Sequence, residues 1–216
     1  MGNFFSVDGA LYKFMSRLWD MVQLNFMWFI CSIPIVTMGA ATTAAYSITL
    51  KMVDDEEGYI VGPFWKAFKA NLKKGSIMGV ILLVAMYALY LDLQFFKAVK
   101  EYSFLFLGIF VIGMVLTVFH FLYAFPLLAR YENSIINTMR NSFRISLKYI
   151  PKTIFLVILL LLEYLLFFAP LHKTLLFFGL ILGPACFILT VSGFARQFFR
   201  NIERENEIRE EEKKRH

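Results

Sequence analysis

The sequence predicts an all-α membrane protein, a polytopic helical bundle with five to six hydrophobic helical segments and amphipathic cytoplasmic helices. Three observations predict this class. Hydrophobic residues make up 59% of the chain and charged residues only 18%, whereas about a quarter of the residues in a soluble domain are charged. Basic residues gather in the segments between long apolar stretches. Asp, Glu, Lys and Arg are absent from residues 76–91, 103–129, 153–162 and 174–195.

Four of the predicted helices are long enough to cross a bilayer. A hydrocarbon core about 30 Å thick needs roughly 20 apolar residues at about 1.5 Å each. We predict spans at residues 75–93, 104–129, 153–168 and 174–194, the last two joined as an antiparallel hairpin by a very short link. Residues 1–195 then form a single transmembrane domain. Residues 196–216, with Glu and Arg or Lys four apart, form a charged cytoplasmic helical tail.

The N-terminal region leaves its path open. Residues 1–17 predict an amphipathic segment lying on the membrane surface. Residues 18–50 contain Pro34, which kinks or ends a helix, followed by small residues that let helix backbones approach closely. This stretch can form one kinked span, two tilted short helices or a re-entrant pair, because two full spans need about 40 residues. The side of the membrane on which the N-terminus lies depends on this path and is also left open.

The distribution of positive charge predicts the orientation. Residues 51–74 hold five Lys, residues 130–152 five Lys or Arg, and residues 196–216 seven, whereas the other loops hold only Lys97, Lys100 and Lys173. Basic loops stay on the cytoplasmic side of a membrane. The C-terminus is therefore expected in the cytoplasm.

Several function classes lack their sequence signals. The chain has no phosphate-binding Gly-Lys-Ser/Thr loop, no paired His motif and no Gly-x-Ser-x-Gly elbow. Cys31 and Cys186 lie far apart in apolar stretches, where cysteines usually behave as small buried hydrophobes. The net charge of +6 is explained by membrane topology and comes with no nucleic-acid recognition pattern. We therefore expect no enzymatic activity, no cofactor, no metal and no nucleic-acid partner.

Polar residues inside apolar segments are the candidates for an intramembrane site. Glu163 lies within a predicted span, where a charged carboxylate costs about 2.5–3.5 kcal/mol and should face the bundle interior. It is either a proton or substrate-hydroxyl site or a structural carboxyl bonded to a neighbouring helix. His120 falls within roughly 8 Å of the same depth, so a His–Glu pair is one hypothesis. Asp20 and Asn25 either line a polar cavity with them or lie at the membrane interface.

A second candidate site is an amphipathic cytoplasmic surface. Just before the predicted span 75–93, aromatic residues at helical spacing lie on one side of a helix and lysines on the other. A second helix with a basic face follows residue 130. Such a surface docks a partner protein or lies on anionic lipid, and the lipid interpretation is favoured. Its residues are Phe64, Trp65, Lys66, Phe68, Lys69, Arg140, Arg144 and Lys148.

Residues 34–46 (PIVTMGAATTAAY) resemble the signature of the YesL-like family of bacterial integral membrane proteins. The resemblance continues through residues 55–59 (DEEGY) and 64–73 (FWKAFKANLK) to residues 130–133 (RYEN). It implies a multi-pass protein of the bacterial plasma membrane, chiefly of Gram-positive species. Members are often encoded beside carbohydrate uptake systems of the ABC type. The family has no agreed catalytic residues, so the resemblance implies none here.

Two functions remain as hypotheses. The leading one is a non-enzymatic accessory or regulatory subunit that associates with the permease or ATPase subunits of a carbohydrate ABC importer. The alternative is an independent transporter or channel for small solutes, working as a homo-oligomer around a polar intramembrane path that includes Glu163. Both place the chain in a lipid bilayer.

Overall fold

The computed structural model of the protein describes residues 10–56, 58–98, 102–168 and 173–215. Within these residues the chain is helical, with no strand, which confirms the predicted all-α class. Residues 1–9 of the predicted surface segment lie outside the described part. The elements are α1 (Ala10–Ser32), the 3-10 turn η1 (Ile35–Thr37), α2 (Met38–Val53), α3 (Val61–Ala98), α4 (Ser103–Phe121), α5 (Ala124–Arg130), α6 (Ile135–Lys148), α7 (Ile150–Phe168) and α8 (Lys173–Arg215).

Four helical segments are long and apolar enough to cross a membrane: Val61–Ala98, Phe104–Arg130, Ile150–Phe168 and Gly179–Arg209. The protein is therefore a helical membrane protein. The amphipathic segment before residue 75 and the span after it form one continuous helix, α3, and the charged tail continues the last span within α8. Residues 18–50 fall in two helices separated at Pro34, and neither is among the four segments.

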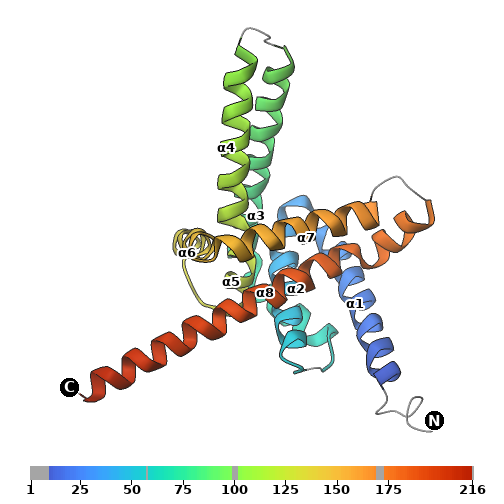
Figure 1. The fold of residues 1–216 in the computed structure, drawn as a ribbon. Coiled ribbons are helices and arrows are strands. Elements are labelled where there is room, and N and C mark those ends of the chain that lie inside the picture. Colours follow the sequence, from blue (N-terminus) through green and yellow to red (C-terminus); the bar gives the residue numbers. More distant parts are fainter. Residues whose placement is uncertain (1–9, 57, 99–101, 169–172, 216) are drawn as a thin grey trace.

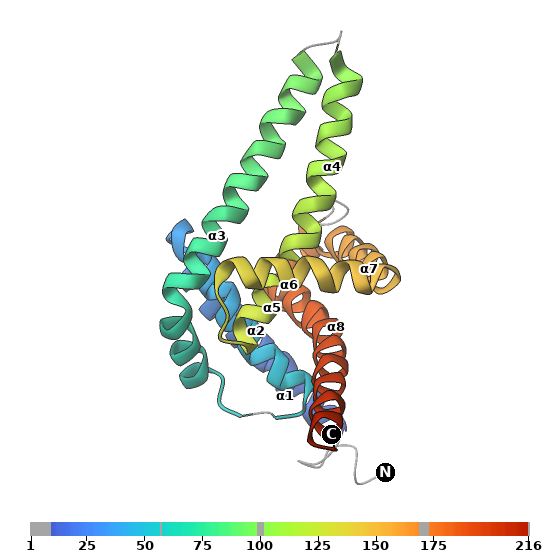
Figure 2. The ribbon, with the colours of Figure 1, turned by 90° about the vertical axis from the view of Figure 1, so that its left-hand side faces the viewer.

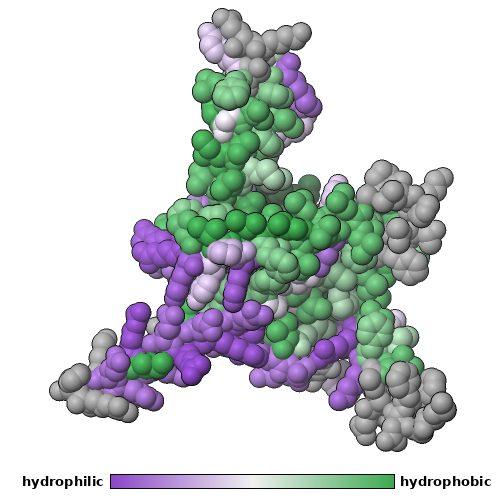
Figure 3. Space-filling model, in the orientation of Figure 1, coloured by the Kyte–Doolittle hydropathy of each residue, from purple (hydrophilic) through white to green (hydrophobic). Residues whose placement is uncertain are grey.

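Two long hairpins, α3–α4 and α7–α8, diverge from a common base formed with α1, α2 and α5 (Figure 1). At most 11% of the apolar window of α3, α4 or α7 is buried within the protein. Apolar side chains cover α4 and α7, whereas hydrophilic ones gather on α6 and the C-terminal half of α8 (Figure 3). These exposed apolar surfaces require a lipid environment, because leaving them in contact with water would be unfavourable.

The base is built around α2, whose small residues allow close helix contact. Ala40, Ala41, Ala44 and Ala45 are fully buried. A Cβ atom on Gly39 would lie 2.2 Å from the carbonyl oxygen of Gly75 and 2.7 Å from Cα of Gly79. Only glycine permits this backbone approach between α2 and α3. The small-residue pattern of the sequence therefore marks the helix crossing that organises the base.

The helix predicted over residues 104–129 is broken between α4 and α5, and α6 compensates for the break. In an unbroken helix the Tyr123 amide would donate to the Phe119 carbonyl. Instead it donates to Ser142 Oγ (3.3 Å), and the Phe119 carbonyl accepts from Ser142 Oγ (3.2 Å) and Ser146 Oγ (3.0 Å). Figure 2 shows α6 lying across the base of α4. The two serines thus satisfy backbone groups that the break would leave unbonded.

Candidate functional site

A cavity of about 340 Å³ opens between α5, α6 and α8, and we call it the basic groove. Its floor is apolar, because Leu127, Ile145 and Phe199 are buried. Its walls and rim are amide, aromatic and basic side chains. The lining residues are Leu127, Tyr131, Asn133, Asn141, Arg144, Ile145, Lys148, Phe199 and Ile202. No carboxylate is among the described residues that line it.

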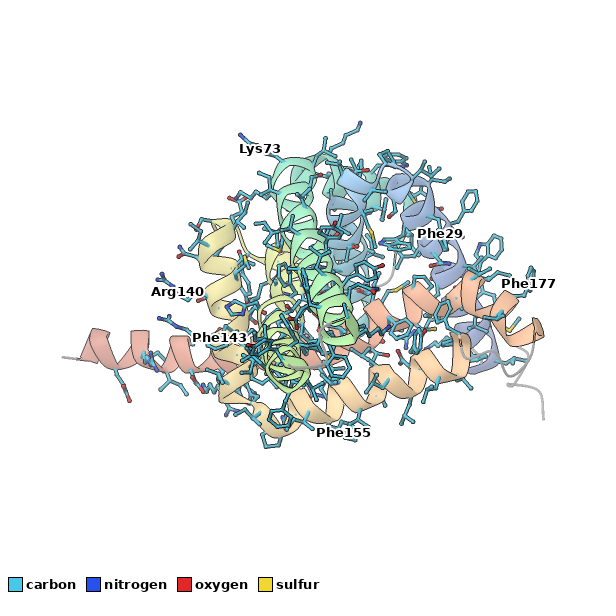
Figure 4. The ribbon with its side chains drawn as sticks, turned by 90° about the horizontal axis from the view of Figure 1, so that it is seen from above. Phe29, Lys73, Arg140, Phe143, Phe155 and Phe177 are labelled. Carbon is cyan, nitrogen blue, oxygen red and sulfur yellow. The ribbon has the colours of Figure 1, made fainter. Side chains whose placement is uncertain are left out.

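The rim of the basic groove carries positive charge that the protein only partly neutralises. Lys148 pairs with Glu205 (2.9 Å), and this hydrogen bond raises the pKa of Lys148. Arg144, which lines the groove, and Arg140, one helical turn before it on α6 and outside the lining, are exposed and make no ion pair within the described residues. Figure 4 shows Arg140 projecting outward from α6, and Lys73 outward from α3. An anionic group from outside the chain would complete this rim.

A network of ion pairs behind the basic groove joins α2, α5 and α8. At the end of α2, Asp55 adopts a positive φ of 57°. The amides of Asp55 and Glu56 donate to the carbonyls of Met52 (3.2 Å) and Lys51 (3.1 Å), a Schellman turn that fixes the neighbouring Asp54. The Asp54 carboxylate accepts from Arg196 Nε at 2.6 and 2.8 Å and also from Arg200.

The same network continues to the groove wall through Glu203. Its carboxylate pairs with Arg196 (3.2 Å) and Arg130 (2.9 Å) and accepts the Tyr131 hydroxyl (2.7 Å). The side chains of Asp54 and Arg196 are only 12% and 14% exposed, so water screens their pair weakly. Hydrogen bonding to Arg196 lowers the pKa of Asp54. Burial raises the pKa of Tyr131 to about 12, which keeps its phenol protonated as a donor to Glu203.

Glu163 lies at the contact between α7 and α8. Its Oε1 accepts a hydrogen bond from Thr190, while its Oε2 is buried without a partner in the described residues. The Thr190 side chain also lines an open polar recess of about 620 Å³, shared with Arg17, Arg196 and Arg200. Glu163 is therefore bonded to a neighbouring helix and lies one side chain away from this polar recess.

His120 does not pair with Glu163. Its Nδ1 lies 2.8 Å from the carbonyl oxygen of Leu116 in its own helix, and its ring stacks on Phe143 of α6 at 4.6 Å between centroids. No hydrogen bond joins His120 to Glu163 among the described residues. The structure gives the two residues different partners, Phe143 of α6 for His120 and Thr190 of α8 for Glu163.

Asn25 has a backbone partner on α8. Pro184 lies inside α8 and has no amide to donate to the Leu180 carbonyl four residues earlier. Asn25 Nδ2 donates to that carbonyl (2.7 Å) and to the Ile181 carbonyl (2.9 Å). Leu180 and Thr190 are ten residues apart, about 15 Å along the helix, so Asn25 and Glu163 act at different levels of α8.

Asp20 lines a different cavity of about 320 Å³, which Lys51 and Glu56 also line. Glu163, Thr190 and His120 are not part of its lining. The four polar residues predicted from the sequence therefore do not converge on one intramembrane site.

Only some of the α3 residues predicted to form an amphipathic surface are exposed. Phe64 is fully buried in the core, so its assignment to an exposed face is wrong. Phe68 is partly buried against the same core, while Trp65, Lys66 and Lys69 are exposed. Phe64 turns inward because α2 and the base offer its ring an apolar environment within the protein. On α6, Arg140, Arg144 and Lys148 are exposed.

The network residues Asp54, Arg196 and Glu203 were not predicted from the sequence. An acidic run after α2 and basic residues in the tail were visible, but Asp54 and Arg196 are 142 residues apart. The only signal in the sequence was negative charge near Asp54 and positive charge near Arg196, and this does not specify which residues form an ion pair.

Residues 21–93 match the model of a family described as a protein of unknown function, DUF624. The match covers about a third of the chain and contains the second half of α1, all of α2 and α3 as far as Leu93, including the crossing glycines and Asp54. The basic groove, built from α5, α6 and α8, lies beyond it. No curated protein matches the chain. No solved structure matches it.

Proposed function

We infer that the protein is a non-enzymatic membrane adaptor, an accessory or regulatory subunit whose basic groove docks an acidic amphipathic helix of a partner protein. The observation that carries this inference is the combination of an apolar floor with Arg144 in the lining, an exposed arginine that makes no ion pair within the described residues. Amphipathic helices bind such grooves by burying apolar anchors and placing polar groups at the rim. Acidic residues on the partner would complement the rim.

The specific partner that we propose is a permease or ATPase subunit of a carbohydrate ABC importer. The resemblance to YesL-like proteins supports this choice, and so does the lack of any ATP-binding loop in the sequence. The basic groove would then face the cytoplasm of a bacterial cell, as the clustering of Lys and Arg in its neighbourhood favours. In this function the protein itself catalyses no reaction.

A photocrosslinking amino acid at Asn141, which lines the basic groove, tests this proposal in native membranes. The matched control is the same substitution at Ile136, which is 71% exposed on α6 and does not line the groove. We expect Asn141 to yield an adduct with an ABC subunit, identified by mass spectrometry and reduced in an Arg144→Glu background. An adduct with lipid alone would instead assign the rim to anionic headgroups and refute protein docking.

A second candidate is an independent transporter of small solutes, in a homo-oligomer or alone. It is favoured by one observation, the Thr190 side chain that both lines the polar recess and donates to Glu163. Flux of sugars or ions into liposomes tests it, with Glu163→Gln as the variant and Glu205→Gln as the control. Flux that is lost only in the Glu163 variant would support this function, and absence of flux in the unmodified protein would remove it.

A further inference from the structure

An apolar cavity of about 270 Å³ lies where the two hairpins meet, and we call it the apolar pocket. Gly79 and Leu83 of α3 line one side, and Pro184 and Phe187 of α8 another. Trp28 of α1 and Thr42 of α2 also line it. Both α3 and α8 contribute residues from their uncharged stretches, 76–91 and 174–195. The apolar pocket therefore lies at the level of the hydrocarbon core.

The walls of the apolar pocket cannot close on each other. Gly39 and Gly79 face each other where α2 crosses α3, and a Cβ on either would lie within 2.9 Å of the other's backbone. The backbones already touch there, so α3 cannot move closer to α2. On the opposite wall, Asn25 holds α8 one turn before Pro184, through its hydrogen bonds to the carbonyls of Leu180 and Ile181. The space is thus a consequence of rigid backbone contacts on both sides.

The apolar pocket offers nothing to water. Among the described lining residues the one hydroxyl is that of Thr42, which accepts from Trp28 Nε1 (3.0 Å) and donates to the Met38 carbonyl (2.8 Å), so its proton is already engaged within the protein. Apolar cavities without polar partners stay dry and take up apolar guests. A sugar or an ion would lose its hydrogen bonds on entering. The occupant must therefore be a hydrocarbon.

The apolar pocket is continuous with the lipid-facing surface of α3. Leu83, which lines it, is 39% exposed, and its neighbours Val80 and Val84 are 40% and 63% exposed. A hydrocarbon chain at this surface can enter the cavity without crossing any polar group. We propose that the apolar pocket binds one acyl chain of a bilayer phospholipid. The chain fills the space between the two hairpins and acts as a resident part of the folded protein.

Trp28 provides a built-in reporter for this site. We would retain it as the single tryptophan by the substitutions Trp19→Phe and Trp65→Phe, which remove the two exposed indoles. Phospholipid with brominated acyl chains is then titrated into the delipidated protein in detergent. The expected result is saturable quenching of Trp28 fluorescence at about one lipid per protein, relieved by unbrominated phospholipid but not by the chain-free headgroup.

Cavity-filling variants separate this site from ordinary surface lipid. Leu83→Phe and Leu82→Phe place extra carbons in the lining, and Val84→Phe places them on the same helix outside it. We expect at least a fivefold loss of apparent affinity in either filling variant, whichever retains native circular dichroism, and none in Val84→Phe. Quenching that rises linearly with brominated lipid, or that is equal in all three variants, would overturn the proposal. Absence of quenching would overturn it as well.

Discussion

Arg196 in the middle of α8 and Asp54 at the end of α2 form a largely buried ion pair, with Nε 2.6 Å from Oδ2. The pair joins the part of the chain that matches the DUF624 family to the helix that forms one wall of the basic groove. Arg196 also pairs with Glu203, which accepts a hydrogen bond from Tyr131 on the other wall and pairs with the neighbouring Arg130. The geometry of the groove therefore depends on a contact outside it.

We predict that Asp54→Asn destabilises the protein by about 3 kcal/mol, because it leaves two arginines near a partly buried position without their carboxylate. Asp55→Asn is the matched control. Asp55 pairs with Arg17, but its side chain is 81% exposed, and asparagine tolerates its left-handed backbone. The control should lose less than about 1 kcal/mol. Denaturant unfolding in detergent measures both, and equal losses would contradict the role given to Asp54.

The Asp54 pair should also make stability depend on pH. Hydrogen bonding to Arg196 lowers the pKa of Asp54 in the folded state below its unfolded value of about 4. A depressed carboxyl pKa contributes stability that is complete above the unfolded pKa and is lost as pH falls through the folded one. Melting temperatures measured between about pH 6 and pH 3 should therefore fall more steeply for the unmodified protein than for Asp54→Asn. Parallel curves would show that Asp54 is not responsible.

Asn25 and Pro184 should be energetically coupled. Asn25→Leu leaves the Leu180 carbonyl without a donor in apolar surroundings, and we expect a loss of about 1–3 kcal/mol. Pro184→Ala restores the backbone amide that normally bonds this carbonyl. A double-mutant cycle should therefore show a smaller cost of Asn25→Leu in the Pro184→Ala background. If the two costs are equal, the side chain does not compensate for the proline.

The α2–α3 crossing should not tolerate a methyl group. Gly39→Ala places Cβ 2.2 Å from a backbone oxygen, and overpacking of this kind costs about 1–3 kcal/mol or more. Gly108→Ala on α4 is the control, because nothing lies within 4 Å of its Cβ position. It should be neutral or slightly stabilising through helix propensity. Thermal unfolding followed by circular dichroism compares the two variants, and a stable Gly39→Ala protein would refute the close approach.

The all-α membrane class was predictable from the sequence because the hydrophobic signal is local. Uncharged blocks such as residues 76–91 and 174–195 specify spans by length alone. The contacts between helices are not local, and this is where prediction failed. Counting residues placed His120 and Glu163 at similar depth, but depth does not say which helices are neighbours. Phe64 was assigned to a surface because its periodicity cannot distinguish lipid from a protein core.

The places where a helix loses a backbone hydrogen bond were harder still to predict. The sequence around Pro184 does not indicate that Asn25 bonds the carbonyl left free there. The sequence around Phe121 likewise does not indicate that two serines of α6 bond the Phe119 carbonyl. Those partners were visible only as isolated polar residues, which is why Asn25 was considered for a polar cavity. In the structure the Asn25 amide instead donates a hydrogen bond to the Leu180 carbonyl, which has no backbone donor because residue 184 is proline.

The unbroken course of α8 from Lys173 to Arg215 has a mechanical consequence. Pro184 borders the apolar pocket, and Phe199 and Ile202 border the basic groove. Because one continuous helix carries both sets of residues, a rotation of α8 would move both. Bilayers with shorter acyl chains change the tilt of membrane-spanning helices. We therefore expect the yield of the partner crosslink at Asn141 to change when the protein is reconstituted in lipids of different chain length.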